Sequence, residues 1–258
     1  MKMRIHWIVI LCLVAGGVMR IEPGAAQAQQ QQATAVLPSD KELDALLAAK
    51  KWNELGAASS LGQSGEAVTR MMNWLHTRID TGGGFFLSFL YARNLWNAGS
   101  FFKVDDPNKD LRITAALITL YAYELIVIDG AKCADKSAPS RRADQLFMYG
   151  GRALNYLKTK PEELKAKVIE TAIGYEKRTE QWRKDDDLLC RDGMEEIKAG
   201  IDAGTTHEVP SQSGHYGKTI AVEPPPGFAP RFLAPEAYLP IQQRGRSEMR
   251  ANLLKLIH

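Results

Sequence analysis

Cysteine is scarce in this sequence, and no redox or haem-attachment motif is present. The 258 residues include three cysteines and no Cys-x-x-Cys, so the usual thiol-exchange and c-type haem patterns are excluded. Cys12 lies in an N-terminal leader, which leaves Cys133 and Cys190. An even number of cysteines in an exported chain predicts one disulfide between them, expected to contribute about 4 kcal/mol. Two separate buried thiols are the alternative.

Common catalytic motifs are missing as well. There is no G-x-S-x-G elbow, and the segment Gly62-Gln63-Ser64-Gly65 has the wrong spacing for one. His207 and Glu208 begin like a zinc-protease motif, but the second histidine is absent and Pro210 would break the helix. The run Gly82-Gly83-Gly84 completes neither a dinucleotide-binding loop nor a P-loop. These absences exclude familiar enzyme classes and favour a protein without catalytic activity, although they leave an unfamiliar enzyme open.

The sequence also has little excess of charge of either sign. It contains 33 basic and 30 acidic residues, a net charge of +3. Residues 1–28 hold three of the basic residues and one of the acidic ones, so the remainder carries 30 against 29. A nucleic-acid-binding protein usually shows a clustered basic face, so no nucleic-acid partner is expected.

The first 28 residues have the layout of a secretory signal peptide. Lys2 and Arg4 precede an apolar run over 5–18, and Ala26-Gln27-Ala28 provides a small-residue cleavage motif. We expect cleavage after Ala28 and a periplasmic or secreted location, without a permanent membrane span. Two charged residues between the apolar run and the cleavage motif leave an uncleaved anchor as the alternative.

Strand-like alternation of polar and apolar residues is absent between 39 and 202, whereas apolar residues recur at steps of three and four. This pattern predicts an all-α domain over 39–202, either an irregular multi-helix bundle or a short stack of helical hairpins. A Gln/Ala-rich tether over 29–38 precedes it. Helices are expected from Ser39 or Asp40, around Trp52, from Ser64 to the Gly82 turn, over 85–96, over 111–128, from Ser140, after Pro161, and from Asp187 through Ile197.

The segment 111–128 is the most hydrophobic part of the chain after the leader. Its length reaches the threshold for a membrane span, but Glu124 favours a central helix buried in protein. A buried carboxylate there must pair, bind a ligand or take up a proton. Pairing with an arginine is the structural hypothesis, the candidates being Arg70, Arg93 and Arg112. The functional hypothesis is an acid/base site that combines Glu124 with His76, which lies at the margin of a helix face.

The chain changes character after Gly204, because seven of its twelve prolines lie in residues 203–258. This pattern predicts a proline-rich arm over 203–258 that ends in a short helix over about 246–257. Aromatic residues between the prolines favour an arm that wraps the helical body, and an arm that hangs free is the alternative. His207 and His215 in this arm are weak candidates for a metal site. No cofactor is expected.

Three hypotheses about function remain open. The leading one is an exported, non-enzymatic interaction or accessory protein whose partners are envelope or secreted proteins. The second is an envelope enzyme, perhaps a hydrolase, that uses Glu124 and His76. The third is a carrier of small molecules or lipids, because the segments around 85–102 and 111–128 supply more apolar surface than a thin bundle needs. The sequence leaves the oligomeric state open.

Overall fold

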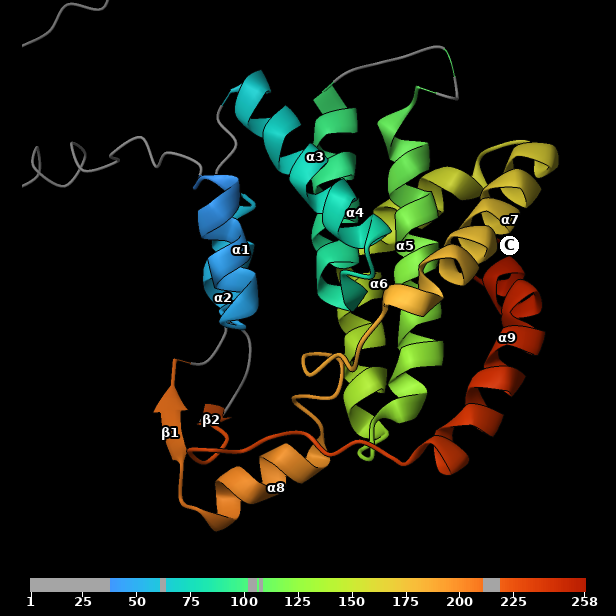
Figure 1. Ribbon diagram of the computed structural model, residues 1–258. Coiled ribbons are helices and arrows are strands. Elements are labelled where there is room, and N and C mark those ends of the chain that lie inside the picture. The colour runs from blue at the N-terminus through green and yellow to red at the C-terminus, as the bar shows by residue number, and fades with distance from the viewer. Residues whose placement is uncertain (1–37, 61–63, 102–105, 107–108, 211–218) are drawn as a thin grey trace, which may run out of the picture. The chain divides into compact units, whose positions relative to one another are not determined.

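The computed structural model (Figure 1) describes residues 38–60, 64–101, 106, 109–210 and 219–258. The expected signal peptide and nearly all of the expected tether lie outside these residues. Contacts between residues group 37–258 into one unit. Within the described ranges this unit contains nine α-helices and two short strands, which confirms the all-α fold.

Helices α1 (Asp40–Ala48) and α3 (Gly65–Asp80) begin where their serine caps predict. In α1 Ser39 and Glu42 form a reciprocal capping box, and Ser64 caps α3 by accepting the Ala67 N–H at 3.1 Å. The short helix α2 (Trp52–Ala58) lies between them. Leu43 of α1 and Leu55 of α2 are fully buried in the main core, so these short helices are stabilised chiefly by packing.

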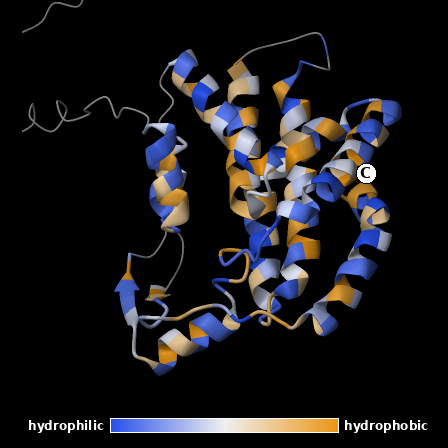
Figure 2. Ribbon diagram, viewed as in Figure 1, coloured by the Kyte–Doolittle hydropathy of each residue, from blue (hydrophilic) through white to orange (hydrophobic). Residues whose placement is uncertain are grey.

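Helix α5 (Leu111–Ile128) is the central element of the fold. It packs against α4 (Gly84–Phe101), α6 (Ser137–Lys158), α7 (Glu162–Thr179) and α9 (Pro235–Ile257). Hydrophobic residues concentrate on α4 and α5 in Figure 2. Length and composition alone would let Leu111–Lys132 cross a membrane, but 67% of its apolar window is buried inside the protein. The prediction of a central buried helix is therefore confirmed.

Two predicted helix starts are wrong. Helix α6 begins at Ser137, three residues before Ser140, because Pro139 falls in the first turn, where its missing N–H costs nothing. The helix expected from Asp187 is α8 (Met194–Asp202), and residues 183–193 form an irregular loop after the 3₁₀ turn η2 (Glu180–Trp182). Asp192 has φ +64° in that loop, a left-handed backbone that interrupts any helix.

A small hairpin that the sequence did not predict follows α8. Strand β1 (Thr206–Val209) pairs antiparallel with β2 (Thr219–Val222), with Thr206 opposite Val222. Residues 231–233 then run beside the 3₁₀ turn η1 (Asp129–Lys132). The Ala134 N–H donates to the Arg231 carbonyl at 2.9 Å, and the Leu233 N–H donates to the Lys132 carbonyl at 2.8 Å.

The last helix is much longer than the one predicted over 246–257. Helix α9 spans Pro235–Ile257, although Pro240 lies within it. Pro235 occupies the first turn, where proline is favoured, so only Pro240 removes a helical hydrogen bond. Burial of Met249, Leu253 and Ile257 in the main core offsets that loss. The C-terminal residues are therefore part of the helical body.

Candidate functional site

Glu124 is fully buried, as its apolar neighbours predict, but it pairs with none of the expected arginines. Within the described residues neither carboxylate oxygen has a hydrogen-bond partner. The three candidates are engaged elsewhere, with these partners: Arg70 with Asp40, Arg93 with Ser59 and Ser60, and Arg112 with Asp110. The prediction of an arginine partner for Glu124 is therefore wrong.

A buried ion-pair cluster beside Glu124 explains its isolation. Arg183, whose side chain is 3% exposed, contacts Asp129 at 2.8 Å and Glu176 at 2.5 Å. Arg246 contacts Glu176 at 3.0 Å and Glu180 at 2.7 Å, so both arginines are already paired with carboxylates other than Glu124. Burial raises the pKa of Glu124 to about 9; the negative charge of Glu176 adds to the shift, and Arg183 opposes it. Glu124 is thus a neutral carboxylic acid at pH 7.

The structure does not bring His76 and Glu124 together. His76 is exposed on α3, its Nε2 lies 3.6 Å from the Asp80 carboxylate, and its ring contacts Tyr91. Neither His76 nor Glu124 lines any of the four best-defined cavities formed by the described residues.

The predicted disulfide is confirmed. Cys133 and Cys190 are bonded, with their Cα atoms 5.2 Å apart. The bond joins the residue after η1 to the irregular 183–193 loop, and both cysteines are buried in a second, smaller apolar cluster. It therefore ties the irregular loop to the helical body.

The histidine pair of the C-terminal region gains no support as a metal site. His207 lies in β1 with Nδ1 3.9 Å from Glu223, and His215 lies outside the described residues. Among the residues that the structure describes, no three His, Cys, Asp or Glu side chains are grouped to hold a metal ion.

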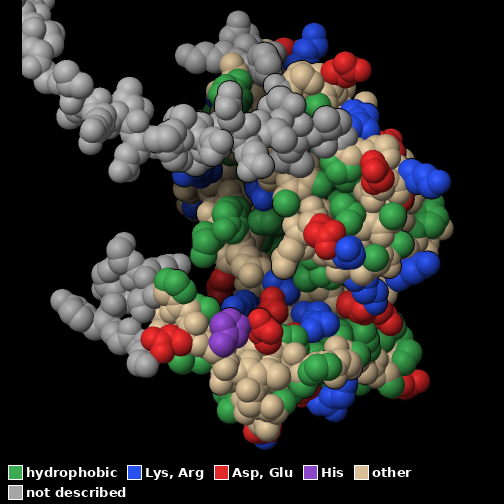
Figure 3. Space-filling view, turned by 90° about the vertical axis from the view of Figure 1, so that its left-hand side faces the viewer, with side chains coloured by type: hydrophobic (Ala, Val, Ile, Leu, Met, Phe, Trp, Pro, Cys, Tyr) green, Lys and Arg blue, Asp and Glu red, His purple; other side chains and the backbone are tan. Residues whose placement is uncertain are grey.

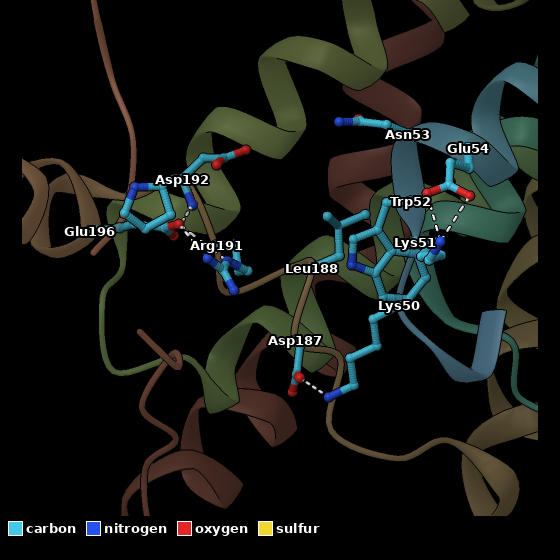
Figure 4. Close-up of a pocket in the computed structure, with 11 residues that line it drawn as sticks. Lys50, Lys51, Trp52, Asn53, Glu54, Asp187, Leu188, Arg191, Asp192 and Glu196 are labelled. Carbon is cyan, nitrogen blue, oxygen red and sulfur yellow. Dashed lines mark hydrogen bonds and ion pairs between the residues drawn. The ribbon is translucent and has the colours of Figure 1, made fainter. Parts of the chain in front are cut away.

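A polar cleft of about 430 Å³ opens where three distant segments meet (Figure 4). Residues 50–54 at the start of α2 form one wall, and residues 187–188 and 191–192 of the irregular loop form the other. Glu196 of α8 and Pro224 after β2 complete the lining. We refer to this site as the polar cleft.

Charges of both signs line the polar cleft and pair with one another. The Lys50 side chain reaches across from the α1–α2 turn to form an ion pair with Asp187, as Figure 4 shows. On the loop side Arg191 contacts Glu196 at 2.8 Å. Acidic and basic side chains also lie next to one another on the face in Figure 3, without a large field of one sign.

The loop that forms one wall of the cleft is fixed at several points besides the disulfide. Arg142, with a side chain 5% exposed, donates from Nε to the Leu188 carbonyl at 2.9 Å and from Nη2 to the Asp192 carboxylate at 2.8 Å. Asp186 accepts the N–H of Phe85 at 3.0 Å and the N–H of Leu189 at 3.1 Å. A segment without regular secondary structure is thereby held in one conformation.

Backbone strain is concentrated at this cleft. Lys50 has φ +55° and Asp192 has φ +64°, and these are the two non-glycine residues with positive φ in the described ranges. Both line the polar cleft. Such backbone costs roughly 1–2 kcal/mol per residue and persists where the surrounding structure enforces it, commonly at ligand clamps and active sites.

A second cavity, of about 620 Å³, lies between the N-terminal half of α3 and the C-terminal half of α4. Its walls are mainly apolar, and none of the described residues that line it is charged. It shares no lining residue with the polar cleft. We refer to it as the α3–α4 cavity.

Sequence reasoning missed the polar cleft because it assigned the acidic run 185–187 to a helix start. Asp186 instead caps the distant helix α4 through Phe85, and Asp187 pairs with Lys50. The predicted disulfide was one signal, because it ties Cys190, three residues after this run, to Cys133 next to η1.

Comparisons with protein-family models, with curated proteins and with solved structures found no match to this chain. Any function is therefore supported by the chain's own geometry rather than by membership of a family.

Proposed function

We propose that the protein is an exported, non-enzymatic binding protein that engages an envelope or secreted protein through the polar cleft. The observation that carries this proposal is that strained backbone and the contacts that fix it occur in the same cleft. The two left-handed non-glycine residues of the described ranges, Lys50 and Asp192, lie on opposite walls of one cleft, and a disulfide and Arg142 lock the Asp192 wall. A site held in its bound conformation loses less entropy on association.

The lining of the cleft indicates the chemistry of the partner. The Lys50–Asp187 and Arg191–Glu196 pairs present both signs of charge, and Trp52 with Leu188 adds an apolar surface between them. A partner segment with one basic and one acidic group beside an apolar side chain is complementary to this arrangement, because complementary charges favour the correct partner.

Other features are consistent with export and with a non-enzymatic role. The disulfide belongs to an oxidising compartment, in agreement with the signal-peptide layout of residues 1–28. Glu124, the candidate catalytic acid or base, is fully buried in the core beside a buried ion-pair cluster.

Site-specific photo-crosslinking in the producing cells tests the proposal. A benzophenone side chain at Asn53 reports on the cleft, and the same group at Lys167, exposed on α7, is the matched control. We expect one defined adduct from position 53, identified by mass spectrometry, and none from position 167.

A pair of arginine variants shows whether that adduct depends on the cleft. Arg191→Ala removes a charge from the cleft, whereas Arg231→Ala removes an exposed arginine that pairs with Glu195. The proposal predicts loss of the adduct in the first variant and its retention in the second. Equal labelling from positions 53 and 167, or an adduct unaffected by Arg191→Ala, would contradict it.

A further inference from the structure

The α3–α4 cavity has the size and lining of a ligand site, and it is separate from the polar cleft. Its volume of about 620 Å³ lies within the roughly 300–1,000 Å³ range of small-molecule pockets. The apolar wall comes from Val68, Met71 and Met72 on α3 and from Ala98 and Phe101 on α4. Methionine side chains adapt to ligands of irregular shape, so this wall suits an apolar molecule.

Phe101 gives independent support, because it exposes 83% of its surface at the edge of the cavity. Large aromatic side chains are normally covered, since burying one is strongly favourable. A ligand that occupies the cavity and contacts this ring would cover apolar surface that the described residues leave open to water.

The absence of charge in the lining selects the class of ligand. Charged residues make up 24% of the sequence, yet none of the described residues lining the cavity is charged. An ionised ligand group placed there would lose hydration without a charged lining residue to pair with, because the nearby Arg93 guanidinium already donates to the hydroxyls of Ser59 and Ser60. The cavity therefore disfavours fatty acids and phosphate esters.

The polar side chains of the lining are three amides and four hydroxyls: Asn73, Asn94, Asn97, Ser59, Ser60, Ser64 and Thr69. The hydroxyls are engaged within the protein, because three of them donate to backbone carbonyls and the fourth caps α3. Asn94 is occupied, because its Nδ2 donates to the Ser59 carbonyl at 3.1 Å. The side chains of Asn73 and Asn97 hydrogen-bond to no described residue, and each offers both donors and an acceptor. Two such amides suit a neutral oxygen group such as a hydroxyl.

We infer that the α3–α4 cavity binds a neutral, mainly apolar small molecule carrying one or two hydroxyl or carbonyl groups, of the class of a long-chain alcohol. This inference goes beyond the proposed function and does not depend on the polar cleft, because a carrier site and a protein-docking site can occupy one chain.

Displacement of the neutral fluorophore N-phenyl-1-naphthylamine from the purified protein tests the inference. The fluorophore should bind saturably, and 1-dodecanol should displace it at a concentration at least tenfold below that of dodecanoate. Absence of saturable binding, or equal displacement by the two competitors, would overturn the inference.

Two variants with matched controls locate the binding. Ala98→Phe fills the cavity and should weaken fluorophore binding about tenfold, whereas Ala251→Phe on the exposed face of α9 should not. Asn97→Lys places a cation at the cavity and should improve displacement by dodecanoate, whereas Asn155→Lys, exposed on α6, should not. If Ala98→Phe fails to fold, Asn97→Lys still provides the test. Equal displacement of the fluorophore by dodecanoate in Asn97→Lys and Asn155→Lys would overturn the inference.

Discussion

Arg142 and Asp192 are 50 residues apart in the chain, yet Nη2 of Arg142 donates to Oδ2 of Asp192 at 2.8 Å. The arginine comes from a regular helix, and the aspartate has a left-handed backbone in an irregular loop. This contact couples the rigid part of the fold to the strained wall of the polar cleft, and it accounts for the persistence of that strain.

Replacement of Arg142 by alanine should be strongly destabilising. The variant removes the nearly buried guanidinium that donates to the Leu188 carbonyl and the Asp192 carboxylate. We therefore expect the free energy of unfolding to fall by about 3 kcal/mol. Urea unfolding gives the value. The neighbouring Arg141 is exposed and reaches only the Asp192 carbonyl at 3.5 Å, so Arg141→Ala should cost less than about 0.5 kcal/mol. Similar losses in the two variants would refute the coupling.

The strained backbone at Lys50 predicts that replacing this residue keeps or raises stability but weakens binding. Asparagine tolerates φ near +55° better than lysine, and the Lys50–Asp187 ion pair is largely exposed and therefore weak. Lys50→Asn should leave stability unchanged or raise it by up to about 1 kcal/mol, and should abolish the Asn53 crosslink. Lys51→Asn, at a residue with ordinary φ, is the control for stability. A clear loss of stability in Lys50→Asn alone would show that Lys50 serves the fold.

The buried acid Glu124 should make the protein less stable as pH rises. Its pKa is about 9 when folded and near 4.5 when unfolded, so the folded state retains a proton that the unfolded state releases between these values. Its favourable contribution is complete below pH 4.5 and is lost as pH rises through about 9. Glu124→Gln should match the parent near pH 4 and exceed its stability at pH 9, by up to about 6 kcal/mol.

Unfolding free energies at pH 4, 7 and 9 measure this effect. The exposed Glu248 provides the control, because Glu248→Gln should keep the parent's pH profile. If the unfolding free energy changes with pH in the same way in Glu124→Gln and in the parent, Glu124 is ionised in the folded protein, which would contradict its raised pKa.

Reduction of the disulfide should loosen the cleft wall as well as lower global stability. Thiol titration should find no free thiol at Cys133 or Cys190 until reductant is added. The cost of removing the bond should be about 4 kcal/mol, since it closes a long loop. Amide exchange should then rise most in residues 185–192, and two free thiols in unreduced protein would contradict this account.

Sequence reasoning succeeded where local rules and packing agree. The Ser39 and Ser64 caps set helix starts, and the apolar run over 111–128 set the central helix. It failed at α9, because composition rich in proline does not show that Pro235 falls in a first turn and that Met249 packs into the core. Prolines in a segment argue against a helix only when they fall in its interior, because proline is tolerated in the first turn.

The polar cleft could not be predicted because it depends on tertiary contacts. Its walls lie more than 130 residues apart in the sequence, as the Lys50–Asp187 pair shows. The left-handed backbones at Lys50 and Asp192 have no local sequence signature comparable to a glycine. The burial of Glu124 was predictable from its neighbours. Its lack of a counter-ion was not, because Arg183 comes from the irregular loop and Arg246 from α9, and both pair with other carboxylates.

A charge-swapped protein tests the proposed binding role most directly. In Lys50→Asp/Asp187→Lys the intramolecular ion pair is kept and the charge that each wall presents is inverted. The matched swap Arg231→Glu/Glu195→Arg inverts an exposed pair outside the cleft. The measurement is the yield of the Asn53 crosslink relative to the parent. We predict at least a tenfold loss in the cleft swap and none in the control swap, with both proteins within about 1 kcal/mol of the parent in stability. An undiminished crosslink in the cleft swap would contradict binding through the polar cleft.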